Sequence, residues 1–268
     1  MKLLRCRTKQ GEIAYGAVQT DGSVLRVIGS PFGAYSVVSE KLAVDRILSP
    51  VDPTNIICIG LNYRKHAEES KMPIPATPVI FFKNSAAACN PEDLVPLPHM
   101  NPDQVDYECE LAIVIGRPAR NVKAQEAAEY VAGYTCANDV SARDAQFADS
   151  AKQWCRGKSF DRFCPLGPYL VKGDGFNPDN AGIRTRLNGQ VMQDSNTNDL
   201  IFSTGTVIEY LSHSFTLVPG TVILTGTPYG VGVARNPQVF LKPGDVVEIE
   251  IDGIGTLKNT IVKEEKPA

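Results

Sequence analysis

The chain consists mainly of short apolar runs separated by turns that are rich in glycine, proline, asparagine and aspartate. Runs of this length are typical of β-strands, which need only about five residues each. Near the start of the chain, weaker strand patterns cover residues 3–6, 13–19 and 23–27. Stronger patterns predict buried strands at residues 56–59, 78–82, 111–115 and 134–138.

Turn residues predict two hairpins in the second half of the chain. Asn188-Gly189 joins strands at residues 183–187 and 191–193, and this dipeptide is typical of a type I′ turn. Asp252-Gly253 joins a second pair, at residues 245–251 and 254–262. Hairpins of this kind indicate antiparallel β-structure rather than a βαβ fold.

Helical patterns are few and short. Residues 124–131 and 206–212 have apolar positions on one face, and Ser203 or Thr204 could cap the second helix. Residues 49–53 form a proline-rich linker. The sequence therefore predicts a mostly β (α+β) protein with a small N-terminal β-rich domain at 1–50 and a larger catalytic domain at 51–268.

Composition excludes several classes of protein. Among the 268 residues, 43% are hydrophobic and 21% are charged, which indicates a globular chain rather than a disordered one. The net charge of −3 offers no basic excess for nucleic acid or an anionic membrane. We find no apolar run long enough to span a bilayer and no signal peptide. We therefore expect a cytoplasmic protein, or one of the mitochondrial matrix if a transit peptide is missing from this chain.

The seven cysteines form no C-x-x-C pair, and the chain has only three histidines. This pattern argues against a structural zinc site and against a disulfide framework. We expect most of the thiols to be small buried hydrophobic groups in a reducing compartment.

The most informative segment is Val105-Asp-Tyr-Glu-Cys-Glu-Leu-Ala-Ile-Val-Ile115. If it is one strand, Asp106, Glu108 and Glu110 share a face beside an apolar run. Buried like charges repel one another, and a hard divalent cation with oxygen ligands would offset them. The alternative is a solvated acidic face, like that of Glu248 and Glu250.

A second polar group follows the strand predicted at residues 134–138. Asp139 stands where that strand ends and could supply a third oxygen ligand. Arg143 and Gln146 come four and seven residues later, so a helical turn would place them on one side. Lys158 lies between a glycine and an aromatic segment and could face a pocket, although a single lysine is more often on the surface.

Two further segments suggest chemistry. His66 and Glu69 have the i, i+3 spacing that lets a carboxylate orient an imidazole as a general base, although an exposed polar turn is the alternative. The glycine-rich stretch 217–232 could bring the hydroxyl of Thr225 or Thr227 to a ligand. It has neither the lysine of a P-loop nor a G-x-G-x-x-G pattern, so we do not expect a nucleotide site.

Six motifs in this order together resemble the fumarylacetoacetate hydrolase family, over residues 55–262 or so. They are Gly60-Leu-Asn-Tyr63 with His66, Asp106-Tyr-Glu-Cys-Glu-Leu111, Asn138-Asp-Val-Ser-Ala-Arg-Asp144, Gly157-Lys-Ser-Phe-Asp161, Cys164-Pro-Leu-Gly-Pro168 and Leu224-Thr-Gly-Thr-Pro228 with Gly230-Val-Gly232. The resemblance implies a mixed β-roll catalytic domain, a homodimer and a Mg²⁺ or Mn²⁺ ion.

The resemblance also implies roles for individual residues. By position, the metal ligands are Glu108, Glu110 and Asp139. The catalytic residues are His66, Glu69 and Lys158, of which the first two form the dyad that orders a lid helix and activates water. The substrate-binding residues are Arg143, Gln146 and Thr227.

One departure from the family pattern indicates a branch. The founding fumarylacetoacetase has a further aspartate ligand shortly before the histidine, whereas residues 60–65 contain no carboxylate. The chain therefore resembles the smaller acylpyruvase and oxaloacetate decarboxylase branch.

We therefore expect metal-dependent C–C bond cleavage of a small 2-oxo acid through a metal-stabilised pyruvate enolate. The reaction would be hydrolysis of an acylpyruvate (2,4-dioxo acid) or decarboxylation of oxaloacetate. The main alternative is an isomerase of a 2-hydroxymuconate-type diacid, such as 5-carboxymethyl-2-hydroxymuconate or 2-hydroxyhepta-2,4-diene-1,7-dioate. Ureidoglycolate cleavage and a non-catalytic module that binds small acids are further alternatives.

Overall fold

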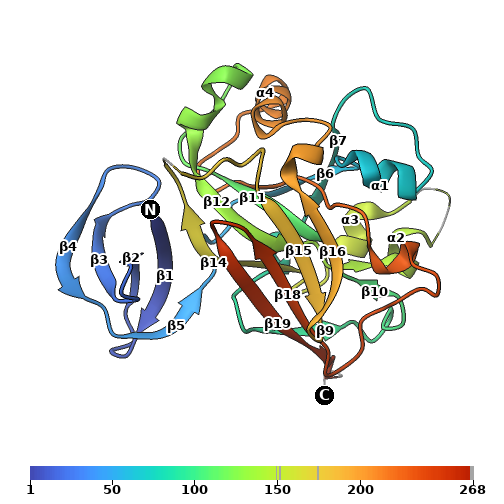
Figure 1. Ribbon diagram of the computed structural model, residues 1–268, viewed down its shortest axis with the longest axis horizontal. Coiled ribbons are helices and arrows are strands. Elements are labelled where there is room, and N and C mark those ends of the chain that lie inside the picture. The colour runs from blue at the N-terminus through green and yellow to red at the C-terminus, as the bar shows by residue number, and fades with distance from the viewer. Residues whose placement is uncertain (149, 151, 174, 266–268) are drawn as a thin grey trace.

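The computed structural model describes residues 1–148, 150, 152–173 and 175–265 and confirms a mostly β protein with few, short helices (Figure 1). The strands are β1 (Lys2–Thr8), β2 (Ile13–Val18), β3 (Val24–Gly29), β4 (Tyr35–Lys41), β5 (Val44–Leu48), β6 (Ile56–Gly60), β7 (Val79–Lys83), β8 (Ala88–Cys89), β9 (Leu94–Leu97), β10 (Val105–Asp106), β11 (Cys109–Ile115), β12 (Val131–Asn138), β13 (Ser141–Ala142), β14 (Cys164–Val171), β15 (Gly182–Leu187), β16 (Gln190–Asn196), β17 (Val222–Leu224), β18 (Val246–Ile251) and β19 (Gly255–Lys263). The α-helices are α1 (Arg64–Glu69), α2 (Arg143–Gln146), α3 (Trp154–Lys158) and α4 (Thr204–Ser214). The 3₁₀ turns are η1 (Ser85–Ala87), η2 (Ala124–Tyr130), η3 (Thr197–Asp199) and η4 (Gly232–Ala234).

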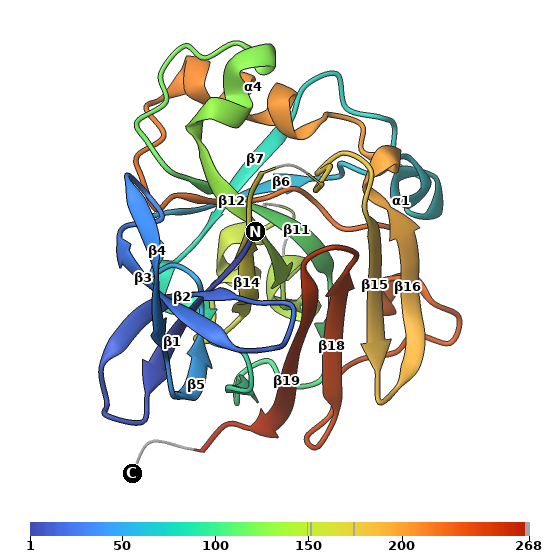
Figure 2. The same ribbon diagram turned by 60° about the vertical axis from the view of Figure 1, so that its left-hand side comes forward.

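Two sheets form the body of the molecule. The larger has the order β4-β3-β2-β1-β14-β12-β11-β17-β6-β7, with β5 beside β1 and β8 beside β14. The smaller has the order β16-β15-β18-β19-β9, and β11 and β12 of the large sheet contact its strands β15 and β18. Figure 2 shows β15, β16, β18 and β19 side by side. Both sheets are mixed, because β17 pairs with β6 and β19 pairs with β9 in parallel.

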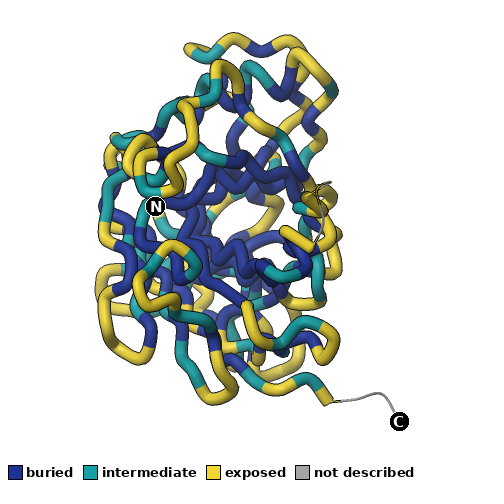
Figure 3. Tube along the Cα trace, turned by 90° about the vertical axis from the view of Figure 1, so that its right-hand side faces the viewer, coloured by how far each residue is buried: buried dark blue, intermediate teal, exposed yellow. Residues whose placement is uncertain are grey.

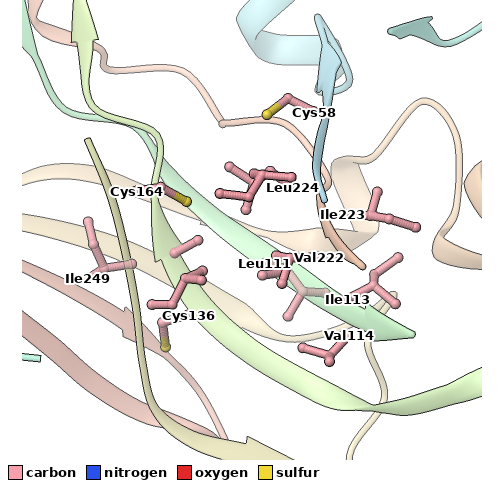
Figure 4. Close-up of a cluster of buried hydrophobic side chains, with 14 of the residues drawn as sticks. Cys58, Leu111, Ile113, Val114, Cys136, Cys164, Val222, Ile223, Leu224 and Ile249 are labelled. Atoms are coloured by element: carbon pink, nitrogen blue, oxygen red, sulfur yellow. The ribbon is translucent and has the colours of Figure 1, made fainter. Parts of the chain in front are cut away.

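The core lies between the two sheets. Every residue of β6, β11, β12 and β17 is buried, and Figure 3 shows the buried segments, in dark blue, gathered in the interior of the molecule. Figure 4 shows Leu111 and Ile113 of β11 packed beside Val222 and Leu224 of β17. Strands buried on both faces need continuous apolar runs, which is the pattern that predicts them in the sequence.

The first five strands continue the large sheet rather than standing apart from it. They lie at one end of the molecule, while α1, α2 and α3 lie at the other (Figure 1). Strand β1 pairs with β14, so Leu3 stands opposite Leu170. The division into domains at residues 1–50 and 51–268 stays a prediction.

Several local predictions are confirmed. Asn188 and Gly189 both have positive φ, at 52° and 81°, as a type I′ turn requires. Helix α4 begins after Ser203, whose hydroxyl accepts a hydrogen bond from the Thr206 N–H. Six of the seven cysteines are buried, Cys155 is the exposed one, and all seven are free.

Other local predictions were wrong. The expected single strand over 105–115 is interrupted at Tyr107 and Glu108, which separates β10 from β11. The strand expected to be buried at 78–82 is instead the edge strand β7, in which Val79 and Phe82 are exposed. The helical stretch expected at 124–131 is present, as the 3₁₀ helix η2. We did not predict β14, because its proline and glycine residues disfavour a strand in sequence reasoning.

Within the described part of the chain, no helix combines the length and the apolar character that crossing a membrane requires.

We predict that Ile113→Ala lowers the free energy of unfolding by about 3 kcal/mol, because it leaves a cavity in a strand whose residues are all buried. Ile28→Ala is the matched control, since that side chain is 55% exposed and its truncation should cost less than about 0.5 kcal/mol. Chemical denaturation of both variants measures the difference. Equal losses would contradict this account of the core.

Candidate active site

Three carboxyl groups meet where neighbouring strands end. Cys109 pairs with Asn138 in the β11–β12 ladder, so Glu108, Glu110 and Asp139 are brought together by strand register. The Asp139 N–H donates to the Glu108 carbonyl at 2.9 Å, and the Glu108 N–H donates to the Asn138 side chain at 3.0 Å. Oxygen atoms of the three carboxyl groups lie within 4.8 Å of one another, and all three residues are buried.

Lys158, at the end of α3, lies against this cluster. Its Nζ donates to Glu108 Oε2 at 2.9 Å and to Asp139 Oδ2 at 2.6 Å. Gly157 makes this approach possible, because a Cβ there would lie 2.7 Å from the Gln146 backbone. The glycine that precedes the lysine in the sequence therefore allows α3 to pack closely on α2.

Lys83, at the end of β7, is a second buried cation that we did not predict. Its side chain is fully buried, and its Nζ donates to Asp139 Oδ1 and, at 3.2 Å, to the Val140 carbonyl. A lysine that directly follows Phe81-Phe82 at the end of a predicted apolar strand was the available signal, because a charge that is buried there needs a partner.

Arg143, the first residue of α2, is the third cation. Its guanidinium donates to Asp106 Oδ2 at 2.8 and 3.0 Å and pairs with Glu108 Oε1 at 2.7 Å. It also donates to Gln146 Oε1 at 3.0 Å. Asp106 therefore lies outside the carboxylate cluster and acts on the site through Arg143.

The surroundings of the carboxyl groups shift their pKa values in opposite directions. Burial favours the protonated form of Glu108, but Lys158 and Arg143 outweigh this and lower its pKa to about 2. Burial, with the charges of Asp139 and Glu108, raises the pKa of Glu110 well above its usual value. Burial alone would lower the pKa of Lys158, but Asp139 and Glu108 raise it, so the ammonium stays protonated.

These residues fit a divalent cation. The donors are carboxylate oxygens, which Mg²⁺ and Mn²⁺ prefer, and each oxygen has more than one lone-pair site. Glu110 has no cation of its own in the described structure, and its Oε2 accepts only the Gly226 N–H, at 2.5 Å. A cation at the cluster would supply the charge that Glu110 needs.

A histidine and a glutamate form a pair on α1. His66 Nδ1 lies 3.0 Å from Glu69 Oε2, and the Gly230 N–H donates to the same carboxylate at 3.0 and 3.2 Å. An imidazole whose Nδ1–H donates to a carboxylate keeps Nε2 free to accept a proton. The side chains of His66 and Glu69 are 15% and 22% exposed, so the dyad lies at the edge of the interior.

A cavity of about 130 Å³ joins these groups. Seven of the nine predicted site residues line it, and they are His66, Glu108, Glu110, Arg143, Gln146, Lys158 and Thr227. The other two, Glu69 and Asp139, contact lining residues. The rest of the wall is mostly apolar and includes Met72, Phe147 and Val233. The structure thus brings together all nine residues, while their catalytic roles stay predictions.

Residues 55–262 match the family described as Fumarylacetoacetate (FAA) hydrolase C-terminal. A Xenopus laevis protein named oxaloacetate tautomerase fahd2, mitochondrial, is 50% identical over 218 residues, which cover 81% of this chain and 68% of that protein. A human protein named oxaloacetate tautomerase FAHD2A, mitochondrial, is 48% identical over 217 residues, which cover 80% of this chain and 69% of that protein.

Solved structures of similar proteins have the same fold. A Mycobacterium smegmatis structure described as 5-carboxymethyl-2-hydroxymuconate delta-isomerase has a TM-score of 0.87 and 40% identity, with 98% of this chain and 100% of that chain covered. A Mycobacterium marinum structure described as 2-hydroxyhepta-2,4-diene-1,7-dioate isomerase has a TM-score of 0.85 and 38% identity, with 99% of this chain and 100% of that chain covered.

We predict that the affinity of the protein for Mn²⁺ rises with pH. The raised pKa of Glu110 means that its carboxyl group binds a proton more readily than a free carboxyl group does, and a cation at the cluster competes with that proton. Lowering the pH favours the proton, so affinity should fall by up to about tenfold per pH unit below that pKa. Glu108, with its pKa of about 2, adds no dependence near neutral pH.

Calorimetric titration with Mn²⁺ between about pH 5 and about pH 8 measures this dependence. The exposed Glu126→Gln is the control for loss of a carboxylate and should keep both the affinity and the slope. His66→Asn should also keep the slope, which separates Glu110 from the imidazole in the same cavity. An affinity that is constant with pH would contradict the assignment.

Proposed function

Because the chain belongs to the fumarylacetoacetate hydrolase family, we propose that it is a Mg²⁺- or Mn²⁺-dependent enzyme that interconverts keto and enol forms of a small 2-oxo diacid such as oxaloacetate. The observation that carries the proposal is one cavity lined by Glu108 and Glu110 of the carboxylate cluster, a protonated lysine and His66. The names of the relatives support tautomerisation, since two of them are oxaloacetate tautomerases. The small cavity supports a short substrate.

Glu108, Glu110 and Asp139 would hold the cation, which when bound would polarise the 2-oxo group of the substrate. Lys158 would donate a hydrogen bond to the same oxygen as negative charge develops there. Its contacts with two carboxylates keep it protonated and fixed, so it needs little reorganisation in the reaction.

His66 would move the proton. Glu69 orients the ring, and Nε2 would take a proton from the carbon beside the carbonyl. The electron pair of that C–H bond then becomes the enol double bond, and the His66 imidazolium returns the proton to the carbonyl oxygen. The reverse steps return the keto form, so the reaction needs no other reactant.

C–C cleavage is the second candidate, because it forms the same enolate. In hydrolysis of an acylpyruvate, His66 would instead take the proton from a water molecule that attacks the distal carbonyl. In decarboxylation of oxaloacetate, CO₂ leaves and no water is needed. Isomerisation of a 2-hydroxymuconate-type diacid is also an enol–keto transfer, and the Mycobacterium structures support that substrate class.

The homodimer and the cytoplasmic location that we expect from the sequence stay predictions. The exposed edge strand β7, with Val79 42% and Phe82 46% exposed, is a surface that a second copy could cover.

We predict that the protein speeds the loss of enol absorbance from oxaloacetate, with Mg²⁺ or Mn²⁺ and not with EDTA. Pyruvate release from oxaloacetate and from acetylpyruvate is measured in parallel, against blanks without protein because metals decarboxylate oxaloacetate spontaneously. Enol loss without pyruvate supports the tautomerase, and pyruvate above the blank supports cleavage. Glu108→Gln should abolish either activity, since it removes a ligand.

If the protein has no activity on either substrate while Mg²⁺ still raises its melting temperature, both reactions are overturned. Isomerisation of a 2-hydroxymuconate-type diacid is then the remaining candidate. Full activity of Glu108→Gln or of metal-stripped protein would overturn the metal-dependent mechanism.

We predict that Glu69→Gln lowers kcat by about a hundredfold, because the neutral amide no longer stabilises the His66 imidazolium. Glu68→Gln is the matched control, since Glu68 is the exposed neighbour on the same helix. The Mn²⁺ affinity of both variants should equal that of the wild type, because neither residue touches the carboxylate cluster. Unchanged kcat in Glu69→Gln would remove the dyad from the mechanism.

A further inference from the structure

A buried glutamine connects the carboxylate strand to the wall of the cavity. Gln193, on β16, is fully buried. Its Oε1 accepts the Cys109 N–H at 3.0 Å and the Thr185 hydroxyl at 2.7 Å. Its Nε2 donates to Thr227 Oγ1 at 2.9 Å and to the Pro228 carbonyl at 2.8 Å.

These partners fix the orientation of the amide. A backbone N–H can only donate and a backbone carbonyl can only accept. If the amide were flipped, its NH₂ would face the Cys109 N–H and its oxygen would face the carbonyl of Pro228. One orientation therefore satisfies every partner, and Nε2 must be the atom that faces Thr227.

This orientation determines what Thr227 can offer to a ligand. Because Nε2 can only donate, Thr227 Oγ1 accepts from it, and the hydroxyl proton is left to be donated elsewhere. In the described structure no oxygen acceptor takes that proton, and the neighbouring Cys109 thiol is a weak acceptor. Thr227 lines the cavity and is 5% exposed, so the cavity is where a stronger acceptor can bind.

We propose that Gln193 is a positioning residue that makes Thr227 a hydrogen-bond donor to an anionic oxygen of the substrate, such as its carboxylate. This inference rests on the proposed function, because it takes a 2-oxo acid as the ligand. Gln193 lies behind Thr227 and outside the cavity lining, so the hydroxyl of Thr227 is its direct connection to a ligand in the cavity.

The probe is oxalate, a planar dianion that resembles the enolate of a 2-oxo acid, titrated into the Mn²⁺-loaded protein by calorimetry. Gln193→Met removes the amide and keeps the length of the side chain. The Kd for oxalate should rise about tenfold, as for loss of a hydrogen bond to a charged group, while the Kd for Mn²⁺ stays within about threefold. Gln190→Met, at an exposed position on the same strand, is the matched control and should bind Mn²⁺ and oxalate as tightly as the wild type does.

Thr227 variants show whether the effect passes through the hydroxyl. Thr227→Val should weaken oxalate binding about as much as Gln193→Met, and Thr227→Ser should bind like the wild type. The double variant Gln193→Met/Thr227→Val should be no weaker than either single variant, because both remove the same hydrogen bond. Effects that multiply would overturn the inference.

The remaining outcomes separate this inference from the proposed function. If the wild type binds Mn²⁺ and oxalate, and Gln193→Met binds each of them as tightly as the wild type does, the inference alone is overturned. If Gln193→Met loses affinity for Mn²⁺ and oxalate alike, Gln193 is only structural and the inference is again overturned. If the wild type does not bind oxalate, both fail together. Should Gln193→Met not fold, Gln193→Glu takes its place, because it keeps the oxygen that Cys109 and Thr185 need.

Discussion

The structure of this site depends on the need to neutralise buried carboxyl groups. The site contains four buried carboxyl groups and three buried cations. The carboxyl groups are those of Asp106, Glu108, Glu110 and Asp139, and the cations are Lys83, Arg143 and Lys158. A buried ion without a partner would cost several kcal/mol. Two of the cations stand on helices of four and five residues, which would not be stable alone. Their ion pairs with the strand ends therefore hold these short helices against the sheet, and Glu110 is the carboxyl group that is left without a cation among the described residues.

Much of the fold could be predicted from the sequence, because burial on both faces imposes continuous apolar runs on the central strands. The run in β11 and the turn at Asn188-Gly189 show this most clearly. The order of the strands could not be predicted. The pairing of β1 with β14 joins residues far apart in the chain, and no local pattern specifies it. The break between β10 and β11 depends on Asp106, which turns toward Arg143 and the N–H groups of Gly232 and Val233.

Site residues could be predicted from the sequence where their spacing along the chain determines their contact. They could not be predicted where tertiary packing determines it. His66 and Glu69 are one helical turn apart, and their contact follows from that spacing. Local pattern left the positions of Lys158 and Thr227 open, and the resemblance to a family assigned both residues to the site. Neither route indicated Gln193, because an amide in a strand has no charge whose burial must be explained.

The glycine-rich loop that follows β17 and runs into η4 joins the two halves of the site. Its N–H groups donate to Glu110 from Gly226, to Glu69 from Gly230 and to Asp106 from Gly232. A Cβ at Gly232 would lie 1.9 Å from the Val239 carbonyl and 2.6 Å from the Asp106 carboxylate, so a side chain there would push the loop off that carboxylate. The loop is therefore bound along its length to the protein's own carboxyl groups. Its shape sets the separation between the carboxylate cluster and the dyad, because each of them is bonded to the same short stretch of backbone.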